Sequence, residues 1–174
     1  MVNLSASVKY HACFDVAYYD SYAIIGYVLF ENHTSEVAVK TGQFRHEKIE
    51  PYVPGEFYRR ELPCLLTAIK QITANISLIY VDANVWLGEN RKGLGCYLYE
   101  ALEEKIPVIG ISKTSFHDSG ARVMPVMRGD STSPLFVSSI GIETAEAAKM
   151  VSEMHGAFRL PAMVKLADTV SRNQ

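Results

Sequence analysis

The hydrophobic pattern of this 174-residue chain changes from strand-like to helix-like shortly after residue 50. Residues 8–44 are rich in Val, Ile, Tyr and Phe, and turn residues interrupt them at 19–21 and 31–33. This pattern is typical of three antiparallel strands joined in a meander. Residues 57–73 follow a Pro-Gly turn and place apolar side chains at helical spacing. We therefore expect an antiparallel sheet that is followed by a helix.

A strand–helix–strand unit comes next, with a strand at 77–81, a helix at 93–105 and a strand at 107–111. This spacing implies a parallel crossover, which is right-handed in nearly all known proteins. Three antiparallel strands joined to a parallel βαβ unit make a mixed α/β sheet of about five strands flanked by helices, which is the ribonuclease H-like order. The remaining segments are expected to be loop and short β segments at 116–139 and helices at 144–154 and 162–171.

Composition limits the class of protein. With 48% apolar and 21% charged residues, residues 1–174 are of a size to form one α/β domain with a substantial core. The net charge of −2 excludes a strong overall basic field, so any binding of a polyanion must be local. Cys13, Cys64 and Cys96 lie far apart without a CxxC pair, which argues against a zinc site and a disulfide framework and favours a reduced, cytoplasmic protein. We expect neither secretion nor membrane insertion.

Three acids lie where their carboxylates can meet at one edge of the sheet. Asp15 interrupts an apolar strand, Asp82 directly follows the strand at 77–81, and Glu61 lies in the first turns of the helix. Carboxylate oxygens are the ligands that hard divalent cations prefer, and such cations serve phosphodiester chemistry. Each acid also has an ordinary explanation, as a half-exposed strand residue, a turn-starting residue or a carboxylate favoured by the helix dipole. The five histidines show no zinc-binding spacing.

Five segments, in order, resemble the endonuclease V family, which nicks DNA near deoxyinosine. They are FDVAYYD, PYVPG followed by RRE, VDAN, GISK and RLPAMVKLAD, and together they cover nearly the whole chain. The resemblance implies a metal-dependent endonuclease, a hydrolase of ester bonds, that acts in DNA repair. It also implies a Mg²⁺ cofactor, for which Mn²⁺ can substitute, and a DNA or RNA partner that contains inosine or a lesion.

The resemblance assigns roles to individual residues. It implies that Asp15, Glu61 and Asp82 bind the metal and that Lys113 contacts the scissile phosphate or polarises the water. Tyr52 would be a wedge that enters the duplex beside the damaged base. The prolines that flank Tyr52 stiffen its loop, although the segment also suits an ordinary turn before a helix. The residues expected to bind nucleic acid are Pro51, Tyr52, Pro54, Gly55 and Arg91.

Several residues depart from the family pattern. The family has a glycine-rich stretch and a His-Pro-Arg after its second Asp, whereas this chain continues with Ala83 and Val85 and offers Asn90-Arg91 as the nearest equivalent. A second family histidine is also missing, and we expect His117 to be the histidine nearest to the site. The alternatives are therefore a nucleic-acid-binding relative with weakened or lost catalysis, or an RNA-directed nuclease of the same fold. Trp86 is either a second stacking residue or a packed core residue.

Overall fold

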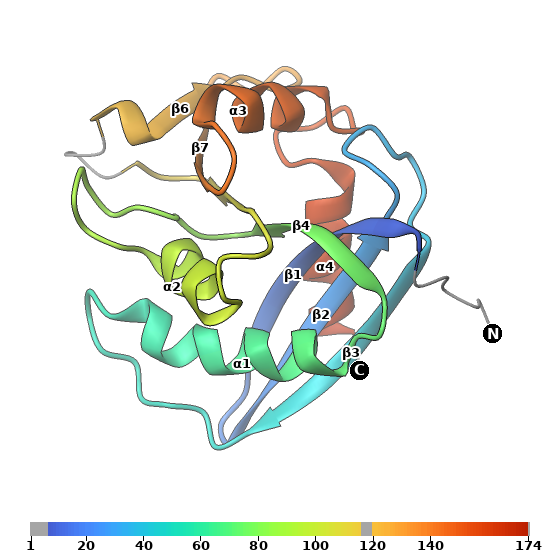
Figure 1. The fold of residues 1–174 in the computed structure, drawn as a ribbon, viewed down its shortest axis with the longest axis vertical. Helices are drawn as coiled ribbons and strands as arrows, with labels where there is room; N and C mark the ends of the chain where they lie inside the picture. The colour runs from blue at the N-terminus through green and yellow to red at the C-terminus, as the bar shows by residue number, and fades with distance from the viewer. Residues whose placement is uncertain (1–6, 116–119, 174) are drawn as a thin grey trace.

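The computed structural model describes residues 7–115 and 120–173. Its first three strands, β1 (Lys9–Tyr18), β2 (Tyr22–Phe30) and β3 (Lys40–Glu47), form the antiparallel meander that the sequence predicts. Strands β4 (Asn75–Val81) and β5 (Val108–Ser112) follow, and β4 pairs in parallel with both β1 and β5 (Figure 1). The ribonuclease H-like order of three antiparallel strands and a parallel unit is therefore confirmed.

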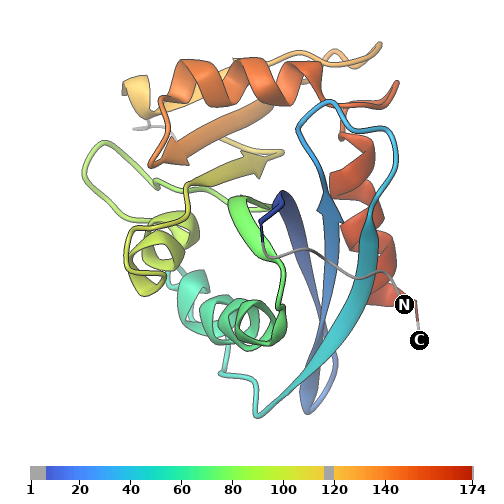
Figure 2. The ribbon, with the colours of Figure 1, turned by 45° about the vertical axis from the view of Figure 1, so that its right-hand side comes forward.

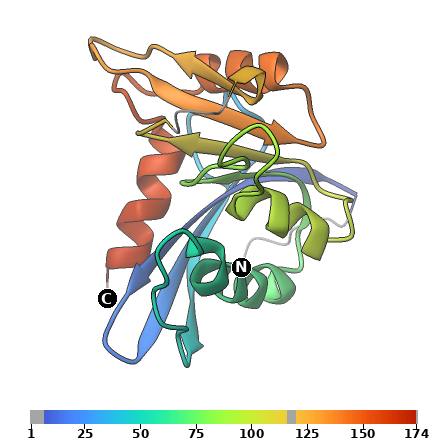
Figure 3. The ribbon, with the colours of Figure 1, turned by 90° about the vertical axis from the view of Figure 1, so that its left-hand side faces the viewer.

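The sheet has seven strands where the sequence predicts about five, in the order β3-β2-β1-β4-β5-β7-β6. The additional strands are β6 (Val123–Val126) and β7 (Leu135–Ile140), which form an antiparallel pair. Strand β7 pairs antiparallel with β5, and Figure 3 shows both added strands continuing the sheet at the top of the molecule. The segment expected to be loop and short β structure thus extends the sheet, because it pairs with an edge of β5 that would otherwise be open.

Helices cover both faces of the sheet. Helices α1 (Phe57–Gln71) and α2 (Leu94–Ala101) lie side by side on one face, with α1 over β1–β3 and α2 over β5 and β7. Helix α4 (Ala162–Arg172) covers β1–β3 on the other face (Figure 2). Helix α3 (Thr144–Glu153) packs on β6 and β7, and a short 3₁₀ turn spans Gly120–Arg122. Helix α2 ends earlier than expected, because Glu103 and Glu104 adopt positive φ angles of 57° and 59°.

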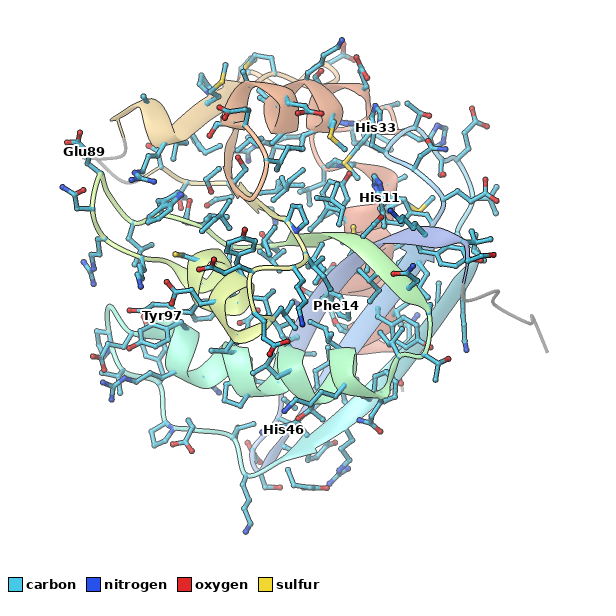
Figure 4. All side chains as sticks on the ribbon, viewed as in Figure 1. His11, Phe14, His33, His46, Glu89 and Tyr97 are labelled. Atoms are coloured by element: carbon cyan, nitrogen blue, oxygen red, sulfur yellow. The ribbon has the colours of Figure 1, made fainter. Side chains whose placement is uncertain are left out.

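Side chains of β1 alternate between two apolar cores. Phe14, labelled in Figure 4, packs in the core beneath α1 and α2, whereas its neighbour Cys13 packs in the core beneath α3 and α4. Asp15, two residues after Cys13 on the same strand, therefore faces the same side as Cys13, toward α4. None of the helices in the described ranges has the length and apolar character that a membrane span needs.

Candidate functional site

Asp15 and Asp82 lie at the same edge of the sheet. The parallel pairing of β1 with β4 ends at Phe14 and Val81; Asp15 is the next residue of β1, and Asp82 directly follows β4. The carboxyl ends of parallel strands are where open α/β sheets place their ligands. The Oδ2 atom of Asp15 accepts a 2.7 Å hydrogen bond from the hydroxyl of Ser171 on α4. Both acids are thus presented at the point where the two strands stop pairing.

Glu61 reaches the same edge from α1, on the opposite face of the sheet. It is only 9% exposed, and its Oε2 atom accepts a 3.3 Å hydrogen bond from the hydroxyl of Tyr18. The guanidinium of Arg60 stacks over the Tyr18 ring at 3.9 Å. Burial raises the pKa of Glu61 to about 8, and the charges of Asp15 and Asp82 contribute to the rise.

The three predicted acids act on one another electrostatically. Burial raises the pKa of Asp15, and the negative charge of Asp82 raises it further. The hydrogen bond from Ser171 acts in the opposite direction and lowers this pKa. Much of the surface of Asp82 is exposed to solvent. Its carboxylate is nevertheless partly buried, and this burial raises the pKa of Asp82. In the described ranges no three His, Cys, Asp or Glu side chains stand in an arrangement that could hold a metal ion. A metal site made by these acids therefore stays a prediction.

Asp168 on α4 is a fourth acid at this edge, and the sequence analysis did not single it out. Its charge raises the pKa of both Asp15 and Asp82. Hydrogen bonds of 2.7 Å from Lys165 and Arg172 lower the pKa of Asp168 itself, so this carboxylate stays ionised. The sequence signal for this residue is the acid that ends the RLPAMVKLAD segment.

Lys113 directly follows β5 and is exposed. Its positive charge lowers the pKa of Asp82 in opposition to the effect of burial, so the lysine lies close enough to act on this acid. Lys113 is therefore positioned to contact a phosphate group that lies near Asp82. His117, the histidine expected nearest to the site, lies outside the described residues.

The loop that carries Tyr52 lies beside Asp82. Tyr52 is 59% exposed, and the flanking Pro51 and Pro54 are exposed as well. Gly55 adopts a φ of +79°, which favours glycine, and its carbonyl accepts a 3.0 Å hydrogen bond from Nη2 of Arg91.

Arg91 therefore ties the tyrosine loop to the loop that follows Asp82. Tyr52, Gly55, Asp82 and Arg91 all line one cavity of about 310 Å³. The structure thus brings the expected nucleic-acid-binding loop and one of the expected metal ligands to a common space, with Arg91 as a structural tie between the two walls.

The segment after Asp82 is fixed over β5. The backbone N–H of Val85 donates a 2.9 Å hydrogen bond to the hydroxyl of Ser138, and a side chain on Gly110 would collide with the carbonyl of Ala83. Val85 is fully buried in the core, whereas Ala83 lines the cavity. The substitution of a glycine-rich stretch by Val85 therefore leaves the cavity open, because this side chain points away from it.

Trp86 packs against the protein. Its indole N–H donates a 3.2 Å hydrogen bond to the carbonyl of Ser139, and the guanidinium of Arg122 covers one face of its ring at 3.8 Å. The structure therefore favours the packed alternative for Trp86 over a second stacking residue.

Comparison with known proteins places these features in a family. A sequence model of the Endonuclease V family matches residues 2–130. Endonuclease V of Nocardia farcinica is 26% identical over 181 residues, covering 91% of this chain and 77% of that protein. Endonuclease V of Xanthomonas oryzae is 29% identical over 191 residues, covering 97% of this chain and 78% of the relative.

Solved structures show the same fold. The Bacillus subtilis endonuclease V structure has a TM-score of 0.75 and 22% identity, covering 97% of this chain and 84% of that one. Ciona intestinalis endonuclease V, solved in complex with a 24mer DNA containing an inosine followed by a ribo-adenosine, has a TM-score of 0.76 and 19% identity. That alignment covers 97% of this chain and 86% of the Ciona chain.

Proposed function

The chain belongs to the endonuclease V family, and from this premise we propose that it is a metal-dependent endonuclease that cuts nucleic acid near deoxyinosine or another damaged or distorted site. One observation carries the proposal: buried Glu61, Asp15 and Asp82 are electrostatically coupled at one sheet edge. Asp82 also lines the cavity that contains Tyr52. A site for phosphodiester chemistry and a loop that can hold a displaced base are thereby adjacent.

The chemistry of these donors suits a hard divalent cation. Asp15, Glu61 and Asp82 offer only oxygen atoms, and each carboxylate is raised in pKa by burial in a region that also contains Asp168. A divalent cation would favour the ionised form of these carboxylates, which burial and their mutual repulsion oppose in the metal-free protein. We propose Mg²⁺, with Mn²⁺ as a substitute, held by Asp15, Glu61 and Asp82 after their side chains reorient.

Each residue then has a distinct task. A divalent cation held by Asp15, Glu61 and Asp82 would activate a water molecule and offset phosphate charge. Lys113, which already acts on Asp82, neutralises the phosphate at the cut. Tyr52 occupies the space of a base that has left the stack, because an exposed aromatic ring offsets the cost of unstacking. Arg91 holds the tyrosine loop against the segment after Asp82.

A second candidate is a relative that binds nucleic acid but no longer cuts it efficiently. It is favoured by the arrangement of the acids, since no three of them form a ready set of ligands in the described ranges. The deciding experiment compares both nicking of and binding to matched DNA and RNA strands, with and without a single inosine, in Mg²⁺, Mn²⁺ or EDTA.

We expect metal-dependent nicking of the inosine DNA strand. Selective binding of inosine strands without nicking in either metal would favour the second candidate, and nicking of the RNA strand alone would assign the protein to RNA. Equal binding to all strands, with no nicking, would refute both functions.

A further inference from the structure

A second groove, of about 800 Å³, adjoins the tyrosine cavity, because Lys113 lines the groove and Ser112 lines the cavity. It runs between residues 155–160 and helix α4, and Lys113 and Lys165 border it. Lys165 is hydrogen-bonded to Asp168, and Lys113 acts on Asp82, so the groove adjoins the acidic edge of the sheet. A strand whose phosphate lies over the acids would enter this groove directly.

The loop that forms one wall of the groove is held firmly by two arginines. Arg128 is 6% exposed and donates hydrogen bonds to the carbonyls of Met154 and Gly156. Arg159 donates to the carbonyls of Lys113 and Pro134, at 2.9 and 2.7 Å.

Both arginine charges lack an acidic partner among the residues that the structure describes. In the described ranges neither arginine forms an ion pair with a carboxylate, and the Nε atom of each is buried without a hydrogen-bond partner. The loop is therefore fixed by hydrogen bonds to the neighbouring backbone, and Arg159 adds a positive charge to the lining of the groove.

This rigid loop presents Phe158 to solvent. The phenyl ring is 80% exposed, although an apolar ring of this size is normally buried. None of the residues that line the groove in the described part of the chain is acidic, and Lys113, Arg159 and Lys165 are all basic. An exposed aromatic ring with basic side chains around it is the arrangement that binds unpaired nucleotides, because bases stack on the ring and phosphates pair with the cations.

We propose that this groove binds unpaired nucleotides of the substrate strand on the far side of the scissile phosphate from the recognised base, with one base stacked on Phe158. The proposal rests on the proposed function, since the acids between the two cavities define where the strand is cut. The strand would run from the cavity with Tyr52, past Asp82 and Lys113, to Phe158. Lys113 lines this groove and its chain neighbour Ser112 lines the cavity with Tyr52 and Asp82, so the two cavities adjoin at the end of β5.

The test uses inosine-containing DNA strands whose unpaired length is extended by zero to six nucleotides, separately on each side of the cut. Cut positions are mapped with the parent protein in Mg²⁺, and affinities are measured in EDTA by fluorescence anisotropy. The parent should gain affinity with length on the side across the cut from inosine. Phe158→Ala should reduce that gain by about 5- to 140-fold, the range for loss of one stacked base.

Val37→Ala is the matched control, because Val37 is an apolar side chain that is 77% exposed and lies outside the groove. It should keep the full gain. An unchanged gain in Phe158→Ala, or an equal loss on both sides of the cut, would overturn the proposal.

A second measurement does not need cutting. A Phe158→Trp variant should show indole fluorescence quenching when a homothymidine strand is added, beyond that of the parent with its single Trp86, and Val37→Trp should not. If the parent fails to nick any strand but the fluorescence of Phe158→Trp is quenched, the proposed function is wrong and the proposal that the groove binds unpaired nucleotides is supported. If the parent nicks inosine strands but quenching and length dependence are absent, the groove proposal fails alone.

Discussion

Replacing Glu61 by Gln should stabilise the metal-free protein at neutral and alkaline pH. The Glu61 side chain is 9% exposed, and its pKa is raised from an ordinary value of 4.5 to about 8, first by burial and then by the charge of Asp15. Folding therefore buries a carboxylate that resists ionisation. Gln keeps the shape and can still accept the hydrogen bond from Tyr18, but it has no charge to bury.

The sign and size of the effect follow from proton linkage. Between pH 4.5 and about 8 the folded chain holds a proton at Glu61 that the unfolded chain has lost, so the free energy of unfolding falls as pH rises. The penalty is nearly absent below pH 4.5. It amounts to about 3 kcal/mol at pH 7 and approaches about 5 kcal/mol above pH 8. Glu61→Gln should remove most of this penalty.

The assay is urea unfolding of the parent and Glu61→Gln in EDTA from pH 5 to pH 9. The difference in unfolding free energy should grow with pH in favour of the variant. Glu89→Gln is the control, because Glu89 is exposed at the margin of the molecule (Figure 4), and its difference from the parent should not change with pH. A difference for Glu61→Gln that is constant from pH 5 to pH 9 would refute the reasoning.

Added Mg²⁺ should stabilise the parent more than Glu61→Gln, because the variant lacks one of the proposed ligands.

Three further variants test the site. Asp82→Asn should nearly abolish metal-dependent nicking while its urea midpoint stays close to that of the parent, and nicking at the parental rate would make Asp82 an ordinary turn residue. Tyr52→Ala should lower affinity for an inosine duplex by about 1–3 kcal/mol more than affinity for an undamaged duplex, measured by anisotropy, whereas equal losses would show that Tyr52 only packs the loop. Arg91→Ala should lose the bond to the Gly55 carbonyl, at about 0.5–1.5 kcal/mol, and weaken inosine discrimination in the same assay. Discrimination equal to that of the parent would contradict a role in holding the loop.

The sequence predicted the elements that have a strong period of their own. The three N-terminal strands, the helix α1 and the βαβ unit around α2 follow from local alternation and helical spacing. Strands β6 and β7 are harder to predict from the sequence, because β6 has only four residues, includes Pro125, and exposes Met124. Such a strand is defined by its pairing with β7 and not by its own pattern, and an edge is where proline is tolerated.

The site shows the same division. Asp15, Glu61, Asp82 and Lys113 lie at the ends or starts of predictable elements, so sequence order alone suggested that they could meet. Asp168 has Lys165 and Arg172 at helical spacing, a pattern that equally describes an exposed ion-paired helix face. Only the packing of the last helix distinguishes these two possibilities.

Gly26 explains how that packing brings α4 to the acids. Gly26 is the register partner of Asp15 on β2, and a Cβ atom at this position would lie 2.5 Å from the backbone nitrogen of Ser171 and 2.7 Å from the carbonyl oxygen of Ala167. The helix therefore rests directly on the strand backbone at the residue beside Asp15. This close approach lets Ser171 donate its hydrogen bond to Asp15 and holds Asp168 near enough to raise the pKa of Asp15. The acidic edge thus depends on a glycine in one strand as much as on the acids themselves, because the glycine sets the height at which the helix lies over the sheet.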